Sequence, residues 1–208
     1  MKTPEIWKHI HSERMDMVAT WDELAPEQWA RSSWCAGWSV QDTAGHILAA
    51  AEQTPANFYK EMVAARFRFN VFADRAAKRL GALSPDELVR RLRIRTSTKN
   101  HPPAPVIAML GEIVVHGEDI RRPLGILHRS PEAALVAVAD NYKNANLLIG
   151  SKRRIAGLRL RATDIVWTHG EGPEVSGPLI SLIMAMAGRA GAHADLTGDG
   201  LGTLAGRG

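Results

Sequence analysis

The run LGEIVVHGEDIRRPLG, residues 110–125, places Glu112 and His116 four positions apart. In an α-helix, residues at this spacing lie on one face, with Cβ atoms roughly 5–6 Å apart. The pair can therefore chelate one ion from a single helix. A second run, GWSVQDTAGHILAAAE at residues 37–52, supplies His46. Two imidazoles and one carboxylate are enough to hold a Zn²⁺-type ion and leave a fourth position open, which is typical of a catalytic metal rather than a structural one.

Helix-start signals place these three side chains on helices. Residues 39–42, Ser-Val-Gln-Asp, match the capping box, in which a hydroxyl and an acid satisfy free amides at a helix start. They predict a helix over 39–66 that carries His46. The proline-rich loop 100–105 precedes a predicted helix over 106–121, which carries the Glu-x-x-x-His pair. The two segments are therefore expected to face each other in a helical bundle, where metal sites are often built. Further helices are predicted at 4–22, 69–81, 84–96 and 130–149.

The composition changes after Gly150. Residues 158–162 alternate apolar and basic side chains, as a half-buried strand does. The sequence also predicts a short strand at 174–176, an apolar helix at 178–189, and glycine-rich turns with a last short strand at 195–208. We therefore expect a mainly α chain with two domains, a helical bundle over 1–150 and a small α/β domain over 151–208. The second domain should lean on the first, because a core of that size is marginal alone.

The bulk composition limits the classes of partner and compartment. A content of 45% hydrophobic and 23% charged residues among 208 excludes global disorder. Cys35 is the single cysteine, so no internal disulfide can form, which fits a reducing cytoplasm. We expect no secretory signal and no membrane span. The net charge is +4, with arginines clustered over 90–95, but no base-reading motif accompanies them. The cluster indicates a solvated helix face, and neither nucleic acid nor membrane is expected as a partner.

Spacing alone leaves other interpretations of the candidate site open. A helical Glu–His pair is often only a hydrogen bond, and His46 is more often a satisfied, partly buried histidine than a ligand. The same donors also suit Fe²⁺, Ni²⁺ or Mn²⁺. Asp119, three residues after His116, is either a partner that fixes the tautomer of that ring or a solvated acid. Cys35 is a nucleophile, a fourth ligand or a small buried hydrophobe, and we favour the last.

Several runs of the chain resemble one known family. The mycothiol-dependent maleylpyruvate isomerase family, within the DinB-like metal-binding superfamily, has an N-terminal signature similar to residues 24–47, LAPEQWARSSWCAGWSVQDTAGHI. Its second signature is similar to the run at 110–125. Its small C-terminal domain is similar to LRLRATDIVW (158–167), GEGPEVSGP (170–178) and LIMAMAGRAGAHADLTGDG (182–200).

The resemblance implies a DinB-like four-helix bundle followed by a small α/β C-terminal domain. It implies a metal held by His46, Glu112 and His116, and mycothiol, the low-molecular-weight thiol of actinobacteria, as co-substrate. In the family an arginine of the C-terminal domain assists catalysis, and Arg189 in the Ala-Gly-Arg stretch is the best positional match.

The leading functional hypothesis is a metal-dependent, mycothiol-using enzyme. A metal-bound thiolate, most readily on Zn²⁺, would attack a small-molecule electrophile or organic acid. Addition and elimination on a conjugated diacid would give cis–trans isomerisation, and retention of the thiol would give S-transfer. Two alternatives stay open: a metal-dependent hydrolase that uses metal-bound water, and a non-catalytic metal- or ligand-binding protein of DinB-like fold.

Overall fold

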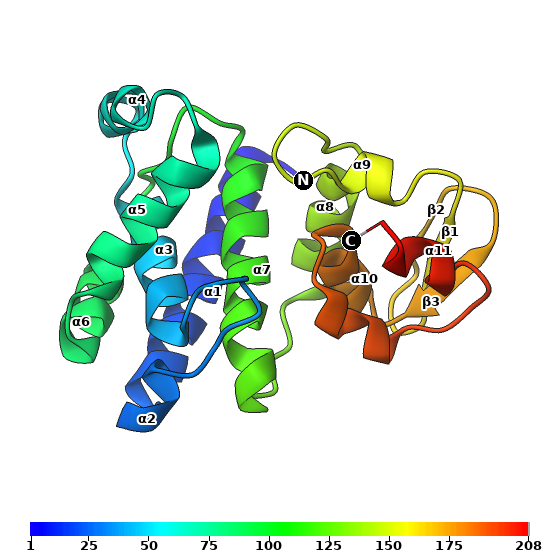
Figure 1. Ribbon diagram of the computed structural model, residues 1–208, viewed down its shortest axis with the longest axis horizontal. Coiled ribbons are helices and arrows are strands. Elements are labelled where there is room, and N and C mark those ends of the chain that lie inside the picture. Colours follow the sequence, from blue (N-terminus) through cyan, green and yellow to red (C-terminus); the bar gives the residue numbers. More distant parts are fainter. Residues whose placement is uncertain (208) are drawn as a thin grey trace. The chain divides into compact units, whose positions relative to one another are not determined.

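The computed structural model describes residues 1–207 and divides into two compact units, Met1–Arg129 and Ser130–Gly208 (Figure 1). The first unit contains α1 (Thr3–Asp22), α2 (Pro26–Trp29), α3 (Val40–Glu52), α4 (Pro55–Ala64), α5 (Phe69–Gly81), α6 (Pro85–Arg95) and α7 (Val106–Leu124). The second contains α8 (Glu132–Tyr142), α9 (Ser151–Arg154), β1 (Arg159–Ala162), β2 (Thr168–His169), β3 (Glu174–Gly177), α10 (Leu179–Met186), the 3₁₀ helix η1 (Ala190–Asp195) and α11 (Leu201–Ala205). The predicted class, a helical bundle followed by a small α/β part, is confirmed.

Four helices of the first unit form a closed bundle. Helix α1 packs on α6 and α7, and α3 packs on the same two helices from the other side. Their inward faces are apolar and fully buried, because each helix repeats hydrophobic residues at helical spacing. The largest of these side chains are Ile10, Met17, Trp21, Leu48, Leu88, Leu92, Leu110 and Ile120. The bundle therefore gives the candidate ligands on α3 and α7 a rigid frame.

Helix α5 packs along the outer side of α3 at unusually short range. A Cβ placed on Gly45 would lie 2.4 Å from the backbone nitrogen of Gly81 and 2.5 Å from the carbonyl oxygen of Ala77. Only glycine allows this backbone contact. Because Gly45 directly precedes His46, the contact also fixes the helix that carries that imidazole.

The helix predicted over 39–66 is in fact two helices, so this prediction was wrong. Helix α3 ends at Glu52, Gln53 is extended, and α4 begins at Pro55 with Thr54 as its N-cap. Proline removes a backbone donor and disfavours helical dihedrals in the residue before it. The chain therefore turns at Gln53, and α4 leaves the axis of α3.

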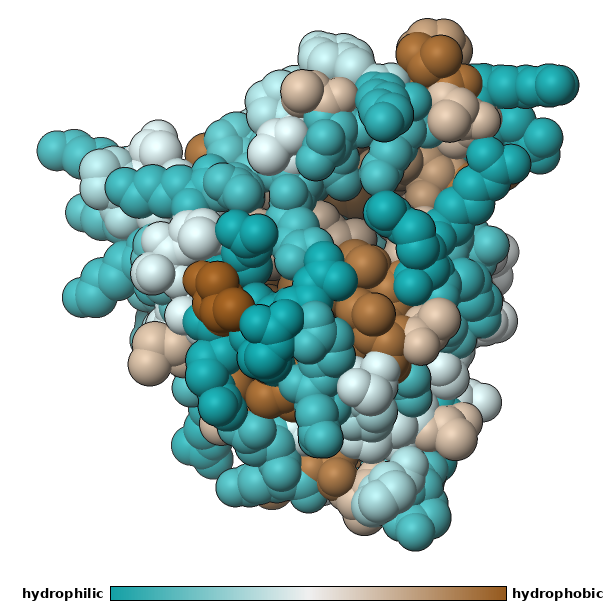
Figure 2. Space-filling model, turned by 90° about the vertical axis from the view of Figure 1, so that its left-hand side faces the viewer, coloured by the Kyte–Doolittle hydropathy of each residue, from teal (hydrophilic) through white to brown (hydrophobic). Residues whose placement is uncertain are grey.

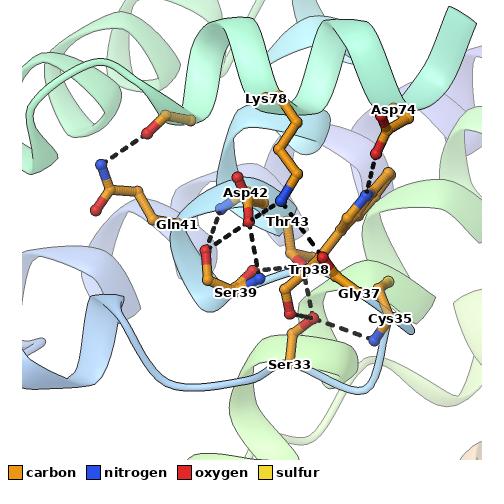
Figure 3. A network of polar contacts seen from close by, with 11 residues as sticks. Ser33, Cys35, Gly37, Trp38, Ser39, Gln41, Asp42, Thr43, Asp74 and Lys78 are labelled. Carbon is orange, nitrogen blue, oxygen red and sulfur yellow. Dashed lines mark hydrogen bonds and ion pairs between the residues drawn. The ribbon is translucent and has the colours of Figure 1, made fainter. Parts of the chain in front are cut away.

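The loop before α3 is tied to two helices by polar contacts (Figure 3). The carboxylate of Asp42 accepts hydrogen bonds from the Ser39 backbone amide at 2.9 Å and from the Lys78 ammonium at 2.7 Å. Lys78, on α5, also donates to the Gly37 carbonyl at 3.3 Å. Burial raises the pKa of Asp42, but the hydrogen bonds from Lys78 and Ser39 outweigh it and leave the pKa below its ordinary value.

Replacing Asp42 with asparagine is expected to lower the free energy of unfolding by about 1–2 kcal/mol at pH 7, because a charge-assisted contact is lost and Lys78 is half exposed. A carboxyl with a depressed folded-state pKa stabilises above its unfolded value, about 3.9, and that contribution is lost as the pH falls through the folded pKa. Urea titrations of the wild type and Asp42→Asn between pH 7 and pH 2.5 should therefore show that their difference in free energy of unfolding shrinks below about pH 4. A difference in free energy of unfolding that stays constant over this pH range would contradict this account.

The second unit is built on a three-stranded sheet of order β2-β1-β3. Strand β1 pairs antiparallel with β2, with Leu160 opposite His169, and parallel with β3, with Leu160 opposite Val175. The alternation predicted for residues 158–162 is present, since Leu160 and Ala162 are buried while Arg159 is exposed. Helix α10 packs against β1, β3 and α8.

Two parts of the second unit differ from the sequence-based expectations. Strand β2 was not predicted, because two residues are too short to show alternation. The stretch after Asp195 contains α11 and a single bridge from Thr197 to Ser176, not a further strand in the sheet. The division between the units also falls after Arg129 rather than near residue 150, because α8 packs on α10.

Most of the face formed by α4, α5 and α6 is hydrophilic, and hydrophobic side chains gather there in small areas (Figure 2). Exposed apolar residues on these elements and their connections include Tyr59, Val63, Phe67 and Ile94. Within residues 1–207, no helix has both the length and the apolar composition needed to cross a bilayer.

Candidate metal centre

The structure brings the three predicted ligands together. His46 extends from α3, and Glu112 and His116 extend from successive turns of α7. The Oε1 atom of Glu112 lies 2.7 Å from Nε2 of His46 and 3.5 Å from Nε2 of His116. The three side chains are mostly buried, with exposed fractions of 14% for each histidine and 25% for the glutamate. Two imidazole nitrogens and a carboxylate oxygen thus form one small cluster at a partly accessible place.

The cluster fits a divalent ion of the zinc type. Bond lengths of about 2.0–2.1 Å in a tetrahedral site put ligand atoms about 3.3 Å apart, close to the separations found here. Oε1 of Glu112 is shielded from solvent, and Nδ1 of His46 is buried without a hydrogen-bond partner within residues 1–207. The lone pairs of these donor atoms repel one another at such short range, and a bound cation would remove that repulsion.

Asp119 orients the imidazole of His116. The ring donates from Nδ1 to Oδ2 of Asp119 at 2.9 Å, and the carboxylate is fully buried. This hydrogen bond directs Nε2 toward Glu112, as in the carboxylate–histidine pairs of metal proteins. The backbone carbonyl of Asp119 also accepts from the Trp34 amide at 3.0 Å, so the loop before α3 is held to α7 at this point.

Cys35 contacts the same carboxylate. Its thiol donates to Oδ2 of Asp119 at 3.0 Å and lies 3.3 Å from Nδ1 of His116. Because Nδ1 faces away from Glu112, the sulfur is on the opposite side of the ring from the three-residue cluster. The contacts therefore make Cys35 a partner of Asp119 and His116, and they do not place it as a fourth ligand beside His46.

The electrostatics of this cluster favour positive charge. Burial acts to lower the pKa of His116, but Glu112, Asp119 and Cys35 act in the opposite direction and raise it well above its ordinary value. The net field at the ring is therefore negative, which is the condition a bound cation needs.

Trp38 forms a wall beside the two histidines. Its ring centroid lies 5.0 Å from that of His46 and 6.5 Å from that of His116. The indole nitrogen donates to Asp74 of α5 at 3.0 Å, which fixes the ring in place (Figure 3). A fixed aromatic wall limits the approach of water and ligands to one side of the cluster.

An apolar pocket of about 70 Å³ opens beside the cluster. His46 and Glu112 form part of its lining, so a ligand in the pocket would border the candidate metal site. The remaining lining residues come from α3, α4, α5, α7 and nearby loops: Ala49, Ala50, Gln53, Phe58, Phe69, Phe72, Ala73, Ala76, Pro102 and Met109. No pattern in the sequence predicts this pocket. The available signal was four phenylalanines within 58–72, three of which line the pocket, near a proline that breaks the helix.

Two other groups of potential ligands occur within the described residues. One combines Cys35, Asp119 and the second ring nitrogen of His116, and the other combines Glu13, Asp16 and His128. In the first, the fully buried Asp119 already accepts hydrogen bonds from the other two members. In the second, His128 lies 3.0 Å from Glu13. The group with His46 differs from both because two of its members line a pocket.

Arg189, assigned to catalysis by the family resemblance, lies in the second unit. It precedes η1, and its guanidinium donates to the Ala187 carbonyl at 2.8 Å. The pKa of the neighbouring Arg154 is lowered, mainly by burial and secondarily by the charges of Arg189 and Arg153. The second unit therefore has a local concentration of positive charge at Arg189. Its role in catalysis stays a prediction.

Comparisons with known proteins find similarity to one family over part of the chain. Residues 10–98 match the model of the mycothiol maleylpyruvate isomerase N-terminal domain. No curated protein matches the chain in sequence. Two solved structures are similar in fold, the mycothiol-dependent maleylpyruvate isomerase and a histidine-to-alanine mutant of it. Each has a TM-score of 0.65 and 14% identity over 96% of this chain and 93% of that chain. Residues 10–98 are therefore similar to the mycothiol maleylpyruvate isomerase N-terminal domain, and the fold of the chain is similar to that of the solved isomerase.

Proposed function

We propose that this chain is a metal-dependent enzyme that uses mycothiol to attack an electrophilic small molecule, either as a cis–trans isomerase or as a thiol S-transferase. The observation that carries the proposal is the convergence of His46, Glu112 and His116 beside an apolar pocket. The family match supports mycothiol as the thiol. The same three residues are proposed to hold the metal, for which Zn²⁺ suits the donor set.

A divalent ion at this place would supply a Lewis acid that lowers the pKa of a thiol. The protein itself would do the positioning. Asp119 accepts a hydrogen bond from Nδ1 of His116 and so aims Nε2 at the cluster. Trp38 restricts access of water, and the pocket holds the electrophile. Arg189 is proposed to bind a substrate carboxylate through paired hydrogen bonds, the strongest geometry available to a guanidinium.

Metal removal tests the proposal directly. Protein treated with a chelator and dialysed should lose both mycothiol binding, measured by calorimetry, and thiol-dependent turnover of a conjugated keto acid. One equivalent of Zn²⁺ should restore both. The thermal midpoint should also rise with metal concentration, because an ion that binds only the folded state stabilises it.

Three outcomes separate the alternatives. Thiol consumption with a stable adduct supports the S-transferase form of the proposal, and thiol-dependent isomerisation without consumption supports the isomerase form. Metal-dependent turnover that proceeds equally without any thiol would overturn the proposal and favour a hydrolase. Retention of metal without thiol binding would also overturn it, in favour of a binding protein.

A further inference from the structure

The pocket beside the metal cluster has walls that suit an uncharged group. The rings of Phe58, Phe69 and Phe72 pack against one another, with centroids 5.4 Å apart for the first and third and 5.7 Å apart for the second and third. Short alanine side chains and Met109 complete most of the wall. Such a surface cannot replace the hydration of a carboxylate, so burying a charged group there is costly.

Among the described residues, no arginine or lysine lines the pocket. Within residues 1–207, the ionisable side chains that line it are His46 and Glu112, and neither is a fixed cation. Arg14 lies with Glu112 in a neighbouring hollow, but its Nη1 already donates to the carbonyls of Arg95 and Thr98 at 3.2 and 3.0 Å. Apart from the metal that His46 and Glu112 are proposed to hold at its edge, the pocket therefore offers a carboxylate no cationic partner within the described residues.

Gln53 supplies one polar group to this apolar surface. The residue is 6% exposed, and its amide nitrogen is buried with no hydrogen-bond partner within the described part of the chain. A buried amide without a partner is unfavourable in the free protein. It is placed here by the break between α3 and α4, which turns the chain at this residue. Its amide is therefore available to a ligand oxygen.

We propose that the electrophile is an unsaturated keto acid with an uncharged apolar end, in which the apolar end enters this pocket and the keto oxygen accepts a hydrogen bond from Gln53. The volume of about 70 Å³ accommodates two or three carbon atoms, at about 30 Å³ for each water-sized group. The inference rests on the proposed function, because it names the substrate class of that same site. It predicts discrimination against diacids at this end of the molecule.

A matched ligand pair tests the proposal in the metal-loaded protein without thiol. The probes are trans-4-oxohept-2-enoate, which ends in a propyl group, and trans-4-oxohex-2-enedioate, which carries a carboxylate at that end. Calorimetry should give a dissociation constant at least tenfold lower for the first probe. Equal affinity, or tighter binding of the diacid, would overturn the proposal without requiring any variant to fold.

Two substitutions, with one control, test whether the propyl ligand binds in this pocket. Ala73→Leu fills the pocket and should weaken binding of the propyl ligand at least tenfold, while Ala133→Leu, an exposed helical alanine of α8, should leave it unchanged. Gln53→Leu should weaken it about twofold to tenfold and raise the thermal midpoint of the ligand-free protein. Unchanged affinity in Ala73→Leu, or a lower midpoint with unchanged affinity in Gln53→Leu, would contradict the assigned contacts.

Turnover with mycothiol separates this inference from the function on which it rests. Selective binding of the propyl ligand without thiol-dependent turnover on either probe would refute the enzyme and leave the pocket assignment intact. Thiol-dependent turnover with preference for the diacid would refute the pocket assignment and leave the enzyme intact.

Discussion

Replacing His116 with alanine is expected to weaken divalent-metal binding by more than about 100-fold, beyond the loss typical of an outer partner, and to abolish thiol-dependent turnover. The variant removes one of three ligands, and the remaining pair, His46 and Glu112, comes from two different helices. Metal per chain after dialysis and the calorimetric affinity for Zn²⁺ measure the effect. His9→Ala is the control, because this half-buried histidine of α1 lies outside the three ligand groups of the described chain. Full metal occupancy in His116→Ala would refute the site.

Asp119→Asn provides a graded test of the same site. The substitution keeps the volume of a fully buried side chain but removes its negative charge. The carboxylate that is lost accepts hydrogen bonds from the His116 ring and from the Cys35 thiol. Metal affinity should fall by about 10–100-fold, the range for outer hydrogen-bond partners of metal-binding histidines. An affinity equal to that of the wild type would show that Asp119 does not orient the ligand.

Gly45→Ala is expected to lower the free energy of unfolding by about 3 kcal/mol, the upper end of overpacking costs. The added methyl would lie 2.4 Å from the backbone of Gly81 and 2.5 Å from that of Ala77. Backbone atoms of packed helices cannot move aside as a flexible side chain can, so α3 and α5 must separate. Thermal unfolding followed by circular dichroism should show a midpoint lower by roughly 6–12 °C.

Gly202→Ala is the matched control for that substitution. Gly202 also lies in a helix, α11, and a Cβ there would meet nothing within 4 Å. Alanine should therefore be neutral or stabilise by up to about 1 kcal/mol, from helix propensity alone. If both glycine variants behave alike, the close approach of α3 and α5 does not control the stability of the bundle.

Local signals predicted most helices, because a helix start is a short-range property. The capping box at Ser39 and the proline starts at Pro4 and Pro85 give the beginnings of three helices to within a residue or two. The same signals were available at Thr54-Pro55, where the prediction of one long helix failed. The helical spacing of apolar residues continues across residues 53–55, and this periodicity favoured one long helix. The N-cap and proline at Thr54-Pro55 correctly indicate a new helix start.

Other features depend on contacts between distant segments and have no sequence signature of their own. Helix α8 looks like the last helix of a bundle, but it packs on α10 and belongs to the second unit. The pocket combines residues from four helices, and its polar group, Gln53, is defined by a missing hydrogen bond. A missing partner is a property of the whole environment, so a sequence pattern cannot reveal it.

The sequence by itself determined which side chains can act. The spacing of Glu112 and His116 puts both on one face of α7, since helical geometry depends only on separation along the chain. The tertiary structure decided that His46 meets them, with Oε1 of Glu112 2.7 Å from its ring. That distance depends on the packing of α3 against α5 and α7. The packing of α3 on α5 in turn requires Gly45, because a side chain there would collide with the backbone of α5. The tertiary structure also decided that Cys35 contacts Asp119 rather than the three candidate metal ligands. The reason is that the loop before α3 is hydrogen-bonded to α7 at Asp119.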